Sequence, residues 1–281
     1  MTALLEVDGL RVQFGRRGLR SRPVEVLHGV SLHVGVAETL GLVGESGSGK
    51  TTIGRTVLGL VTPSSGSIRF AGEDVTSVSR ATRRRLARDI QVVFQDPYTS
   101  LNPALSVGDI LSEPLVVQGM TRRDARARVK GLLDQVNLPS GTENRRPSEF
   151  SGGQRQRVAI ARALAPSPRL IVCDEPVSAL DLTTQAKVLD LLAEIQAQTQ
   201  VSYLFISHDL AVVRHISARV SVLYRGDVVE TGPVREVISS PSHDYTRRLL
   251  LAAPVADPDK QATRRRARRA LIESQTNQKA G

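Results

Sequence analysis

The sequence contains few of the residues on which several classes of site depend. Its 281 residues include one cysteine and no tryptophan, and aromatic residues make up 3%. A single thiol, Cys173, cannot form a disulfide within the chain or supply a cysteine-ligated metal cluster. Its place in an apolar run predicts a buried, unreactive thiol. The scarcity of aromatic rings argues against a surface on which the bases of single-stranded nucleic acid stack.

Long apolar runs are missing as well. Apolar runs such as 170–173 and 220–223 are far too short to cross a bilayer. The N-terminal residues alternate in polarity like a strand and do not have the charged-then-apolar order of a secretion signal. We therefore expect a cytosolic chain whose role at a membrane, where it has one, depends on partner proteins.

The net charge of +10 is partly carried by residues 257–281, which include seven Lys or Arg and three Asp or Glu. The Arg-rich run at 264–269 could bind nucleic acid or anionic lipid headgroups, but a solvated, disordered tail is the favoured interpretation. The Pro-containing stretch 253–258 predicts the end of the packed body, so we place the domain at 1–256 and the tail at 257–281.

Hydrophobic periodicity predicts an α/β fold. Two N-terminal strands are joined by an exposed basic loop at 15–23, and a helical insertion at about 96–150 interrupts the later alternation of strands and helices. Such alternation implies a mostly parallel sheet covered on both faces. The expected strands are 4–14, 24–35, 40–43, 67–75, 88–95, 170–175, 202–207 and strands around 220–230. The expected helices are 52–60, 107–117, one after Thr121, one from about 153 and 183–198.

A glycine-rich segment, GESGSGKT at Gly44–Thr51, lies between an expected strand and an expected helix. It satisfies G-x-x-x-x-G-K-[ST], in which small residues let backbone N–H groups surround phosphate oxygens at a helix N-terminus. Lys50 can reach the β- and γ-phosphates, and the Thr51 hydroxyl can bind Mg²⁺. In this context a simple flexible turn is the poorer interpretation, and we predict a nucleotide-binding loop.

Two acidic residues end the apolar strand LIVCDE. Asp174 is expected to hold the Mg²⁺ shell, and Glu175 is placed to polarise an attacking water molecule. The alternative is an ordinary strand end that enters a turn at Pro176.

A second anion-binding helix start is predicted at SGGQRQR, residues 151–157. Together with the phosphate loop, this segment resembles the ABC ATPase family, whose signature is L-S-G-G-Q; this chain has Phe150 at the first position. The resemblance implies a RecA-like P-loop core with an N-terminal antiparallel β subdomain, an inserted helical subdomain and a short C-terminal extension. It also implies a head-to-tail dimer, in which the signature of one subunit (Ser151, Gly152, Gly153 and Gln154) completes the ATP site of the other.

Further residues match the family in the expected order. The resemblance assigns Gln95 to the loop that senses Mg²⁺ and water, Asp181 to the dimer-contacting loop, and His208 to γ-phosphate contact. Phe14 matches the aromatic residue that stacks on adenine, although it could equally be a core residue. The loop at the dimer contact comprises Ser178, Ala179, Leu180 and Asp181.

The resulting site assignments form three sets. The nucleotide-binding residues are Phe14, Gly44, Glu45, Ser46, Gly47, Ser48, Gly49, Lys50, Thr51, Thr52, Gln95 and Asp174. The catalytic residues are Glu175, His208, Gln95 and Lys50, and the Mg²⁺ ligands are Thr51, Gln95 and Asp174. ATP and Mg²⁺ are therefore the expected substrate and cofactor.

Two segments resemble the oligopeptide/dipeptide/nickel importer branch of the family: DPYTSLNP at 96–103 and SPSHDYTRRLLLAAP at 240–254. The resemblance implies import of peptides or a similar small solute, with Tyr98–Pro103 docking on membrane subunits and an importer-type segment at about 233–256. The implied partners are a second ATP-binding subunit, favoured as a paralogue, two integral membrane permease subunits and an extracellular solute-binding protein. The implied location is the cytoplasmic face of the cell membrane.

Three alternatives remain open on the sequence. An exporter subunit disagrees with the 240–254 segment. A soluble ABC ATPase acting on nucleic acid or ribosomes would need paired nucleotide domains or long coiled-coil insertions, and no nucleic-acid partner is expected. A monomeric P-loop kinase leaves the 151–154 segment and His208 without a role.

Overall fold

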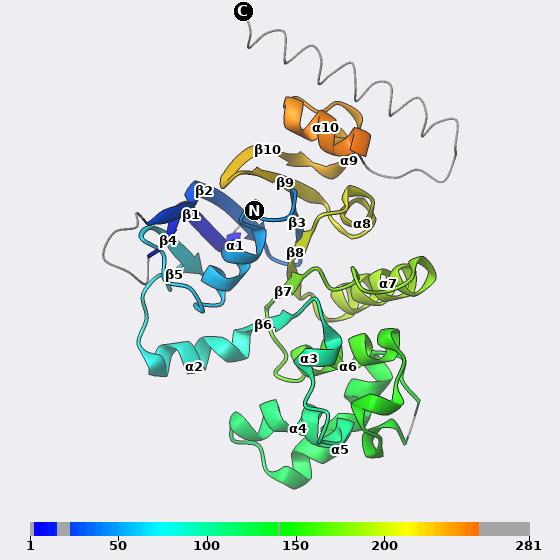
Figure 1. Ribbon diagram of the computed structural model, residues 1–281. Coiled ribbons are helices and arrows are strands. Elements are labelled where there is room, and N and C mark those ends of the chain that lie inside the picture. Colours follow the sequence, from blue (N-terminus) through cyan, green and yellow to red (C-terminus); the bar gives the residue numbers. More distant parts are fainter. Residues whose placement is uncertain (1–2, 16–22, 140, 253–281) are drawn as a thin grey trace, which may run out of the picture.

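A six-stranded sheet forms the centre of the computed structural model, which describes residues 3–15, 23–139 and 141–252 (Figure 1). The strand order is β10-β9-β3-β8-β7-β6, and every neighbouring pair is parallel except β10 with β9. The prediction of a mostly parallel sheet is confirmed. The strands are β3 (Thr39–Val43), β6 (Ile90–Val93), β7 (Leu170–Asp174), β8 (Ser202–Ser207), β9 (Arg219–Tyr224) and β10 (Asp227–Pro233).

Both faces of this sheet are covered, because successive side chains of a strand point to opposite sides. On β8, Tyr203 and Phe205 join one apolar cluster while Leu204 and Ile206 join the other. The first cluster packs under the helices α6 (Gly152–Leu164), α7 (Leu182–Thr199) and α8 (Leu210–Ile216). The second packs against helix α1 (Lys50–Val57) and a second sheet. Cys173 is completely buried, as predicted, and burial raises the pKa of its thiol.

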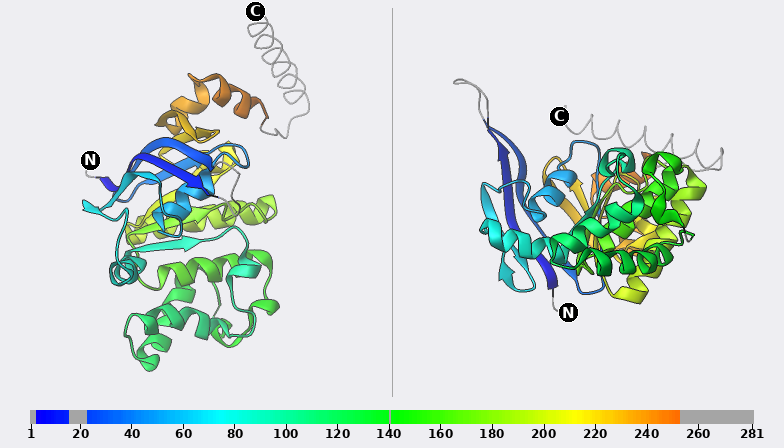
Figure 2. Two further views of the ribbon diagram at one scale, coloured as in Figure 1. Left: turned by 60° about the vertical axis from the view of Figure 1, so that its left-hand side comes forward. Right: turned by 90° about the horizontal axis from the view of Figure 1, so that it is seen from below.

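The second sheet is antiparallel, with order β2-β1-β4-β5, and lies beside α1 in the turned views (Figure 2). Its strands are β1 (Ala3–Phe14), β2 (Val24–Gly35), β4 (Ser65–Phe70) and β5 (Glu73–Asp74). The prediction of one strand over 67–75 is wrong, because Ala71 and Gly72 have φ angles of 51° and 83° and turn the chain back. Most of the predicted basic loop, residues 16–22, lies outside the described residues.

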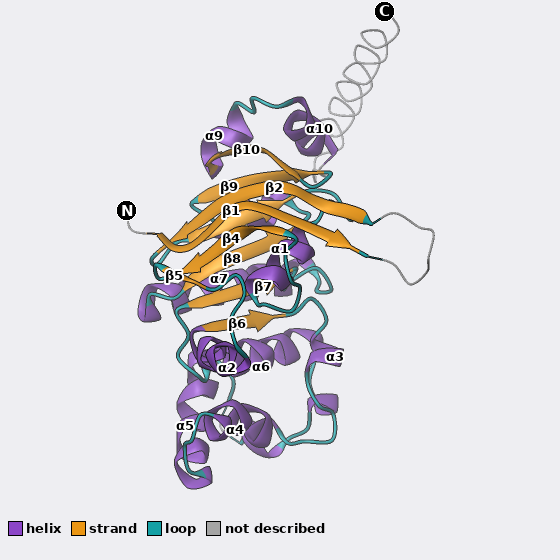
Figure 3. Cartoon of the chain, turned by 90° about the vertical axis from the view of Figure 1, so that its left-hand side faces the viewer, coloured by secondary structure: helices purple, strands orange, loops and turns teal. Residues whose placement is uncertain are grey.

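The predicted insertion is present as a group of helices at one end of the molecule (Figure 3). It contains α3 (Pro97–Ser100), α4 (Val107–Val117), α5 (Arg122–Gln135) and the short 3₁₀ turns η1 (Thr142–Asn144) and η2 (Pro147–Glu149). The Ser106 and Thr121 hydroxyls accept the backbone N–H groups of Asp109 and Asp124 and so cap α4 and α5. The apolar face of α5, formed by Ala125, Val129, Leu132 and Leu133, is buried.

Helix α2 (Arg80–Asp89) was not predicted, and it takes the first residues of the strand expected at 88–95. Its sequence RATRRRLARD has only one buried residue, Leu86, so it lacks the apolar stripe that would announce a helix. At the other end of the expected strand, Phe94 and Gln95 follow β6 and lie in the connection to α3.

The C-terminal part consists of α9 (Val234–Ser239) and α10 (Asp244–Ala252), which lie next to β10 and β9 (Figure 1). The Pro-containing stretch 253–258 and the basic tail 257–281 lie outside the described residues. Within 3–15, 23–139 and 141–252, no helix combines the length and apolar character needed to span a membrane.

Candidate nucleotide-binding site

The glycine-rich loop connects β3 to α1, as its sequence context predicts. A side chain at position 44 would meet the Leu223 carbonyl oxygen at 2.2 Å, so only glycine fits where the loop leaves the sheet. Gly47 and Gly49 have φ angles of 79° and 109°, which residues with a side chain rarely adopt. The loop is thus wrapped around the N-terminus of α1, where backbone N–H groups are available to an anion.

Lys50 is folded back onto this loop. Its ammonium donates to the carbonyl oxygens of Gly44 at 2.7 Å and Glu45 at 2.8 Å, and the residue is 5% exposed. Burial lowers the pKa of Lys50, and the nearby carboxylates of Glu175, Asp174 and Glu45 oppose that shift. An ammonium group has three donors, so one remains to meet a phosphate oxygen while the other two hold the loop.

Thr51, Gln95 and Asp174 line one cavity of about 570 Å³. The Thr51 hydroxyl donates to the Asp174 carboxylate at 3.1 Å. Burial raises the pKa of Asp174; the Thr51 hydrogen bond lowers it, and the neighbouring Glu175 carboxylate raises it further. A cation beside this carboxylate would favour its charged form. The three residues that the sequence assigns to Mg²⁺ are therefore grouped at one place.

The acidic pair at the end of β7 is divided between two environments. Asp174 lines the cavity, whereas Glu175 contacts His208, with its carboxylate 3.2 Å from Nδ1. Glu175 has a φ angle of 50°, a left-handed conformation that is costly for a residue with a side chain, and its N–H donates to the Ile206 carbonyl at 3.0 Å. The backbone turns at Glu175, so the two adjacent carboxylates face different groups: Asp174 faces the cavity and Glu175 faces His208.

The chain's own residues fit a bound phosphate. The Ser48 hydroxyl is buried without a hydrogen-bond partner among the described residues, at the loop that wraps the helix start. A buried hydroxyl without a partner costs free energy, and a phosphate oxygen would satisfy it.

No group of three or more His, Cys, Asp or Glu in the described ranges could hold a metal ion. A Thr hydroxyl, one carboxylate and an amide suit Mg²⁺ that is also held by nucleotide phosphates.

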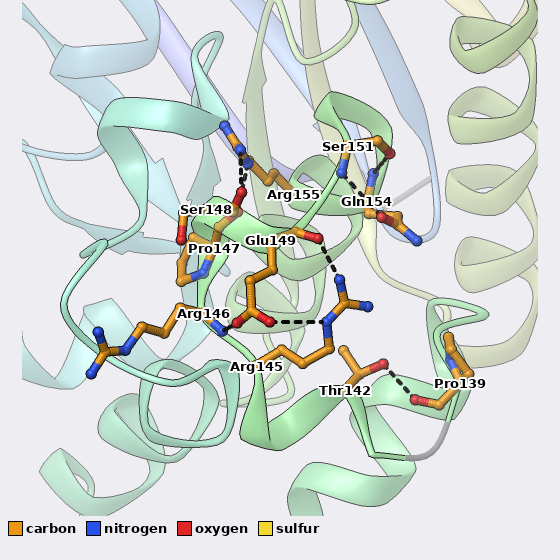
Figure 4. Close-up of polar contacts among 10 residues, drawn as sticks. All are labelled: Pro139, Thr142, Arg145, Arg146, Pro147, Ser148, Glu149, Ser151, Gln154 and Arg155. Carbon is orange, nitrogen blue, oxygen red and sulfur yellow. Dashed lines mark hydrogen bonds and ion pairs between the residues drawn. The ribbon is translucent and has the colours of Figure 1, made fainter.

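The signature segment forms the N-terminus of α6 (Figure 4). The Ser151 hydroxyl accepts the Gln154 N–H at 3.3 Å, and the Gln154 side-chain oxygen accepts the Ser151 N–H at 3.0 Å. The turn before it is held by Arg155, which donates to the Pro147 and Ser148 carbonyls at 2.6 and 3.2 Å. Ser151 is exposed, and no residue of 151–154 is among the described residues that line the cavity at Thr51.

Phe150 replaces the leucine that the family signature has at this position. The ring is buried in the apolar cluster that also packs under α6, α7 and α8, and the Arg145 guanidinium lies over it at 4.3 Å from the ring centre. The departure from the family signature therefore affects a buried packing residue, Phe150, and leaves the exposed Ser151 at the start of α6 unchanged.

The segment 178–181 connects Glu175 to the start of α7. The Ser178 hydroxyl donates to the Glu175 carbonyl at 3.1 Å, and the Asp181 carboxylate caps α7 by accepting the Thr184 N–H at 3.0 Å. The Thr184 hydrogen bonds lower the pKa of Asp181.

Phe14 ends β1 with 47% of its surface exposed, so the alternative that it is a core residue is wrong.

Arg162 lines the cavity at Thr51 but was not singled out from the sequence. Burial lowers the pKa of its guanidinium, which donates to the Ser100 carbonyl. No sequence signal marks it, since an arginine on an amphipathic helix is most simply solvated.

A wrapped glycine-rich loop, a buried lysine that holds it, and a Thr–Asp pair beside a polar cavity define the P-loop class of nucleotide-binding proteins. A family model described as "ABC transporter" matches residues 27–178. OppD, the oligopeptide transport ATP-binding protein of Mycobacterium tuberculosis, is 52% identical over 235 residues, which are 84% of this chain and 38% of that protein.

A Brucella ovis protein, provisionally named a peptide import ATP-binding protein, is 48% identical over 281 residues, 100% of this chain and 87% of that protein. The dimeric ATP-binding cassette MJ0796, bound to ADP and Pi after hydrolysis, superposes with a TM-score of 0.73 at 28% identity, over 82% of this chain and 99% of that chain. The chain belongs to the ABC transporter family of ATP-binding subunits. It spans about 38% of the length of the first curated relatives that it matches.

Proposed function

We propose that this chain is the ATP-hydrolysing subunit of an importer for oligopeptides, dipeptides or a similar small solute. The observation that carries the proposal is the convergence of Thr51, Gln95 and Asp174 on one cavity, next to the contact of Glu175 with His208. The relatives named for peptide transport support the cargo class. The proposed ATPase unit is 1–256, with the helical insertion at about 96–150 and the importer-type segment at about 233–256.

Nucleotide binding is assigned to the loop Gly44–Thr52. Its backbone N–H groups and the remaining donor of Lys50 would hold the phosphates, and the exposed ring of Phe14 would stack on adenine. Thr51, Gln95 and Asp174 would hold Mg²⁺, which when bound neutralises charge on the β- and γ-phosphate oxygens.

Hydrolysis needs a positioned water molecule more than covalent chemistry from the protein. The oxygen of that water attacks the γ-phosphorus as the bond to the β–γ bridging oxygen breaks, so ADP leaves and phosphate is formed. Glu175 is assigned as the group that orients the water and accepts its proton. His208, in contact with the Glu175 carboxylate, is assigned to the γ-phosphate, where it can donate a hydrogen bond.

A second ATP-binding subunit is required by this assignment, because Ser151 is exposed and none of residues 151–154 lines the chain's own cavity in the described residues. We infer a head-to-tail pair, favoured as a paralogue, in which Ser151, Gly152, Gly153 and Gln154 of each subunit face the nucleotide on the other. Residues Ser178, Ala179, Leu180 and Asp181 would contact across the same interface.

The remaining partners are two integral membrane permease subunits and an extracellular solute-binding protein, with this chain at the cytoplasmic face of the cell membrane. The proposed docking residues are Tyr98–Pro103. Tyr98 is 59% exposed and Leu101 is buried, so this segment is anchored and yet open to a partner. Arg155 lies 4.0 Å from the centre of the Tyr98 ring, which ties the docking segment to the signature helix.

Uptake of a labelled oligopeptide tests the proposal. Cells that lack this chain are complemented with the wild type or with Lys50→Ala, and uptake should return only with the wild type. Equal uptake with both would contradict the role of the loop.

Purification of the intact complex from the membrane fraction tests the assembly. It should yield a second ATP-binding subunit and two permease subunits, and their absence would contradict the assembly.

A further inference from the structure

The segment 240–252 has a contact that the proposed function does not use. The Tyr245 hydroxyl, from α10, accepts the backbone N–H of Glu45 at 2.8 Å. Glu45 is the second residue of the phosphate loop, 200 residues away in the sequence. Tyr245 is 1% exposed, and burial raises the pKa of its phenol, so the group stays neutral and able to accept.

The position of the Tyr245 ring is fixed by several contacts. Its centre lies 4.1 Å from that of Tyr224 at the end of β9, with the rings tilted by 31°. The Glu230 carboxylate on β10 accepts the N–H groups of Ser242 and His243 at 2.7 and 3.1 Å. The start of α10 is thereby fastened to the edge of the central sheet, beside β9 and β10 (Figure 3). The Tyr245 hydroxyl therefore has a fixed position from which it can hold the Glu45 N–H.

The loop is held on its other side by the turn after β9. The Gly226 N–H donates to the Ser48 carbonyl at 3.0 Å, and Glu45 uses its own carbonyl to accept the Lys50 ammonium at 2.8 Å and the Ser48 N–H at 3.2 Å. The Glu45 backbone is therefore held by Lys50 at its carbonyl and by Tyr245 at its N–H. Without the phenol, that N–H would lose its partner and the loop would have more conformations available.

We propose that Tyr245 is a positioning residue for the phosphate loop, through which the segment 240–252 sets the affinity of the site for nucleotide. This inference rests on the proposed nucleotide site. It gives the importer-type segment a role in the cassette itself. A change in the seat of α10 on β9 and β10 would alter ATP affinity without any contact between α10 and the nucleotide.

The test compares Tyr245→Phe with Tyr203→Phe in the full chain. Phenylalanine keeps the ring that packs on Tyr224 and removes only the hydroxyl. Tyr203 is a matched control, since its hydroxyl is also buried and donates to a backbone carbonyl, that of Leu192 at 3.1 Å, in the helix-covered core. The Kd of a non-hydrolysable ATP analogue with Mg²⁺ should rise roughly two- to tenfold in Tyr245→Phe, the range for one hydrogen bond.

Two readouts separate positioning from general loosening. In ATPase assays Tyr245→Phe should raise KM and leave kcat within about twofold. Tyr203→Phe should leave Kd and KM at the wild-type values. An unchanged Kd in Tyr245→Phe, or an equal rise in Tyr203→Phe, would overturn the proposal. If the wild type bound no nucleotide, the proposed function itself would fail.

Amide hydrogen exchange tests the contact without nucleotide and without a variant. The Glu45 amide of the nucleotide-free wild type should be protected, since its hydrogen is bonded to a buried oxygen. Fast exchange at Glu45 would overturn the proposal even where Tyr245→Phe did not fold.

Discussion

The two glycine-rich helix starts of this chain have similar composition and opposite surroundings. The phosphate loop before α1 wraps around Lys50, which is 5% exposed and bonded to two loop carbonyls, and we call it the enclosed loop although its tip, residues 45–47, is exposed. The signature before α6 is open, and its Ser151 and Gln154 side chains bond each other's backbone. Both segments are glycine-rich helix starts, but only the phosphate loop lies beside a cavity of the described residues that can hold an anion.

This difference teaches where each half of an ATP site can be built. Beside the enclosed loop lie a Thr–Asp pair, a glutamate and a histidine of the same chain. The two acidic residues stand at the end of β7 and the histidine follows β8, because parallel strands end at one edge of the sheet. The start of α6 has the partial positive charge of a helix N-terminus, and Arg155 holds the turn that precedes it. Within the described residues, however, the nucleotide cavity is not lined by this segment. A second subunit is the simplest way to join them.

Glu175→Gln should have the largest effect, on the enclosed half. Loss of the carboxylate that orients water should lower turnover roughly 10²- to 10⁴-fold, while binding of ATP is retained and a closed dimer accumulates. Phosphate release measures the turnover, and gel filtration with ATP measures the accumulation of the closed dimer. Glu194→Gln, at an exposed position of α7, is the control. A hydrolysis rate equal to that of the wild type would remove Glu175 from its role.

Lys50→Ala should weaken nucleotide binding itself. A charge-assisted hydrogen bond to phosphate and the bonds that hold the loop are removed together, so the Kd of an ATP analogue should rise roughly 10- to 100-fold. Lys187→Ala removes the same charge from the exposed face of α7 and should bind normally. Normal affinity in Lys50→Ala would break the comparison, since the enclosed loop would then not be the phosphate site.

Ser151→Ala sharpens the comparison from the open half. Turnover should fall roughly tenfold, because the Ser151 hydroxyl no longer reaches the nucleotide on the other subunit, while the separate chain keeps its affinity for ATP. The cap of α6 is also removed, at about 1 kcal/mol. Ser79→Ala removes the equivalent cap of α2, where the Ser79 hydroxyl accepts the Thr82 N–H at 3.2 Å, and so controls for stability. Weaker ATP binding by the monomer of Ser151→Ala would place the signature at its own site.

The smallest effect is expected from His28, whose backbone N–H donates to the Gly226 carbonyl behind the phosphate loop. The Asp227 hydrogen bond raises the pKa of His28 above 6.5. A raised pKa gives stability that is complete below the unfolded value and is lost as pH rises through the folded value. The free-energy advantage of wild type over His28→Gln should therefore shrink as pH rises above 6.5, by the roughly 0.2–1 kcal/mol of an exposed pair. Thermal unfolding of both proteins at several pH values measures this difference. An advantage that grows with pH would show that the pair is not charged in this way.

Much of the fold followed from local patterns. The strands at 4–14, 24–35, 170–175 and 202–207 and the helices at 107–117 and 183–198 lie within one or two residues of their predicted bounds. Those segments have strong periodicity or an apolar run between breakers. Helix α2 was missed because its sequence is almost wholly polar, and the turn at Ala71–Gly72 because neither residue interrupts the apolar pattern strongly.

The grouping of Thr51, Gln95 and Asp174 was expected from the resemblance to a family, and the structure places all three on one cavity. Their roles stay predictions. Arg162 and Tyr245 acquire their places from packing between elements far apart in the chain, and no spacing announces such contacts.

The sequence by itself determined the phosphate loop, because wrapping an anion requires glycines, a lysine and a helix start within a few consecutive residues. It also determined the strand that ends in Asp174 and Glu175, because a buried parallel strand needs a continuous apolar run. Only the tertiary structure decided that Glu175 turns to His208 and that Tyr245 holds the N–H of Glu45. The reason is physical: those contacts depend on where whole elements pack, and a local pattern carries no record of its distant neighbours.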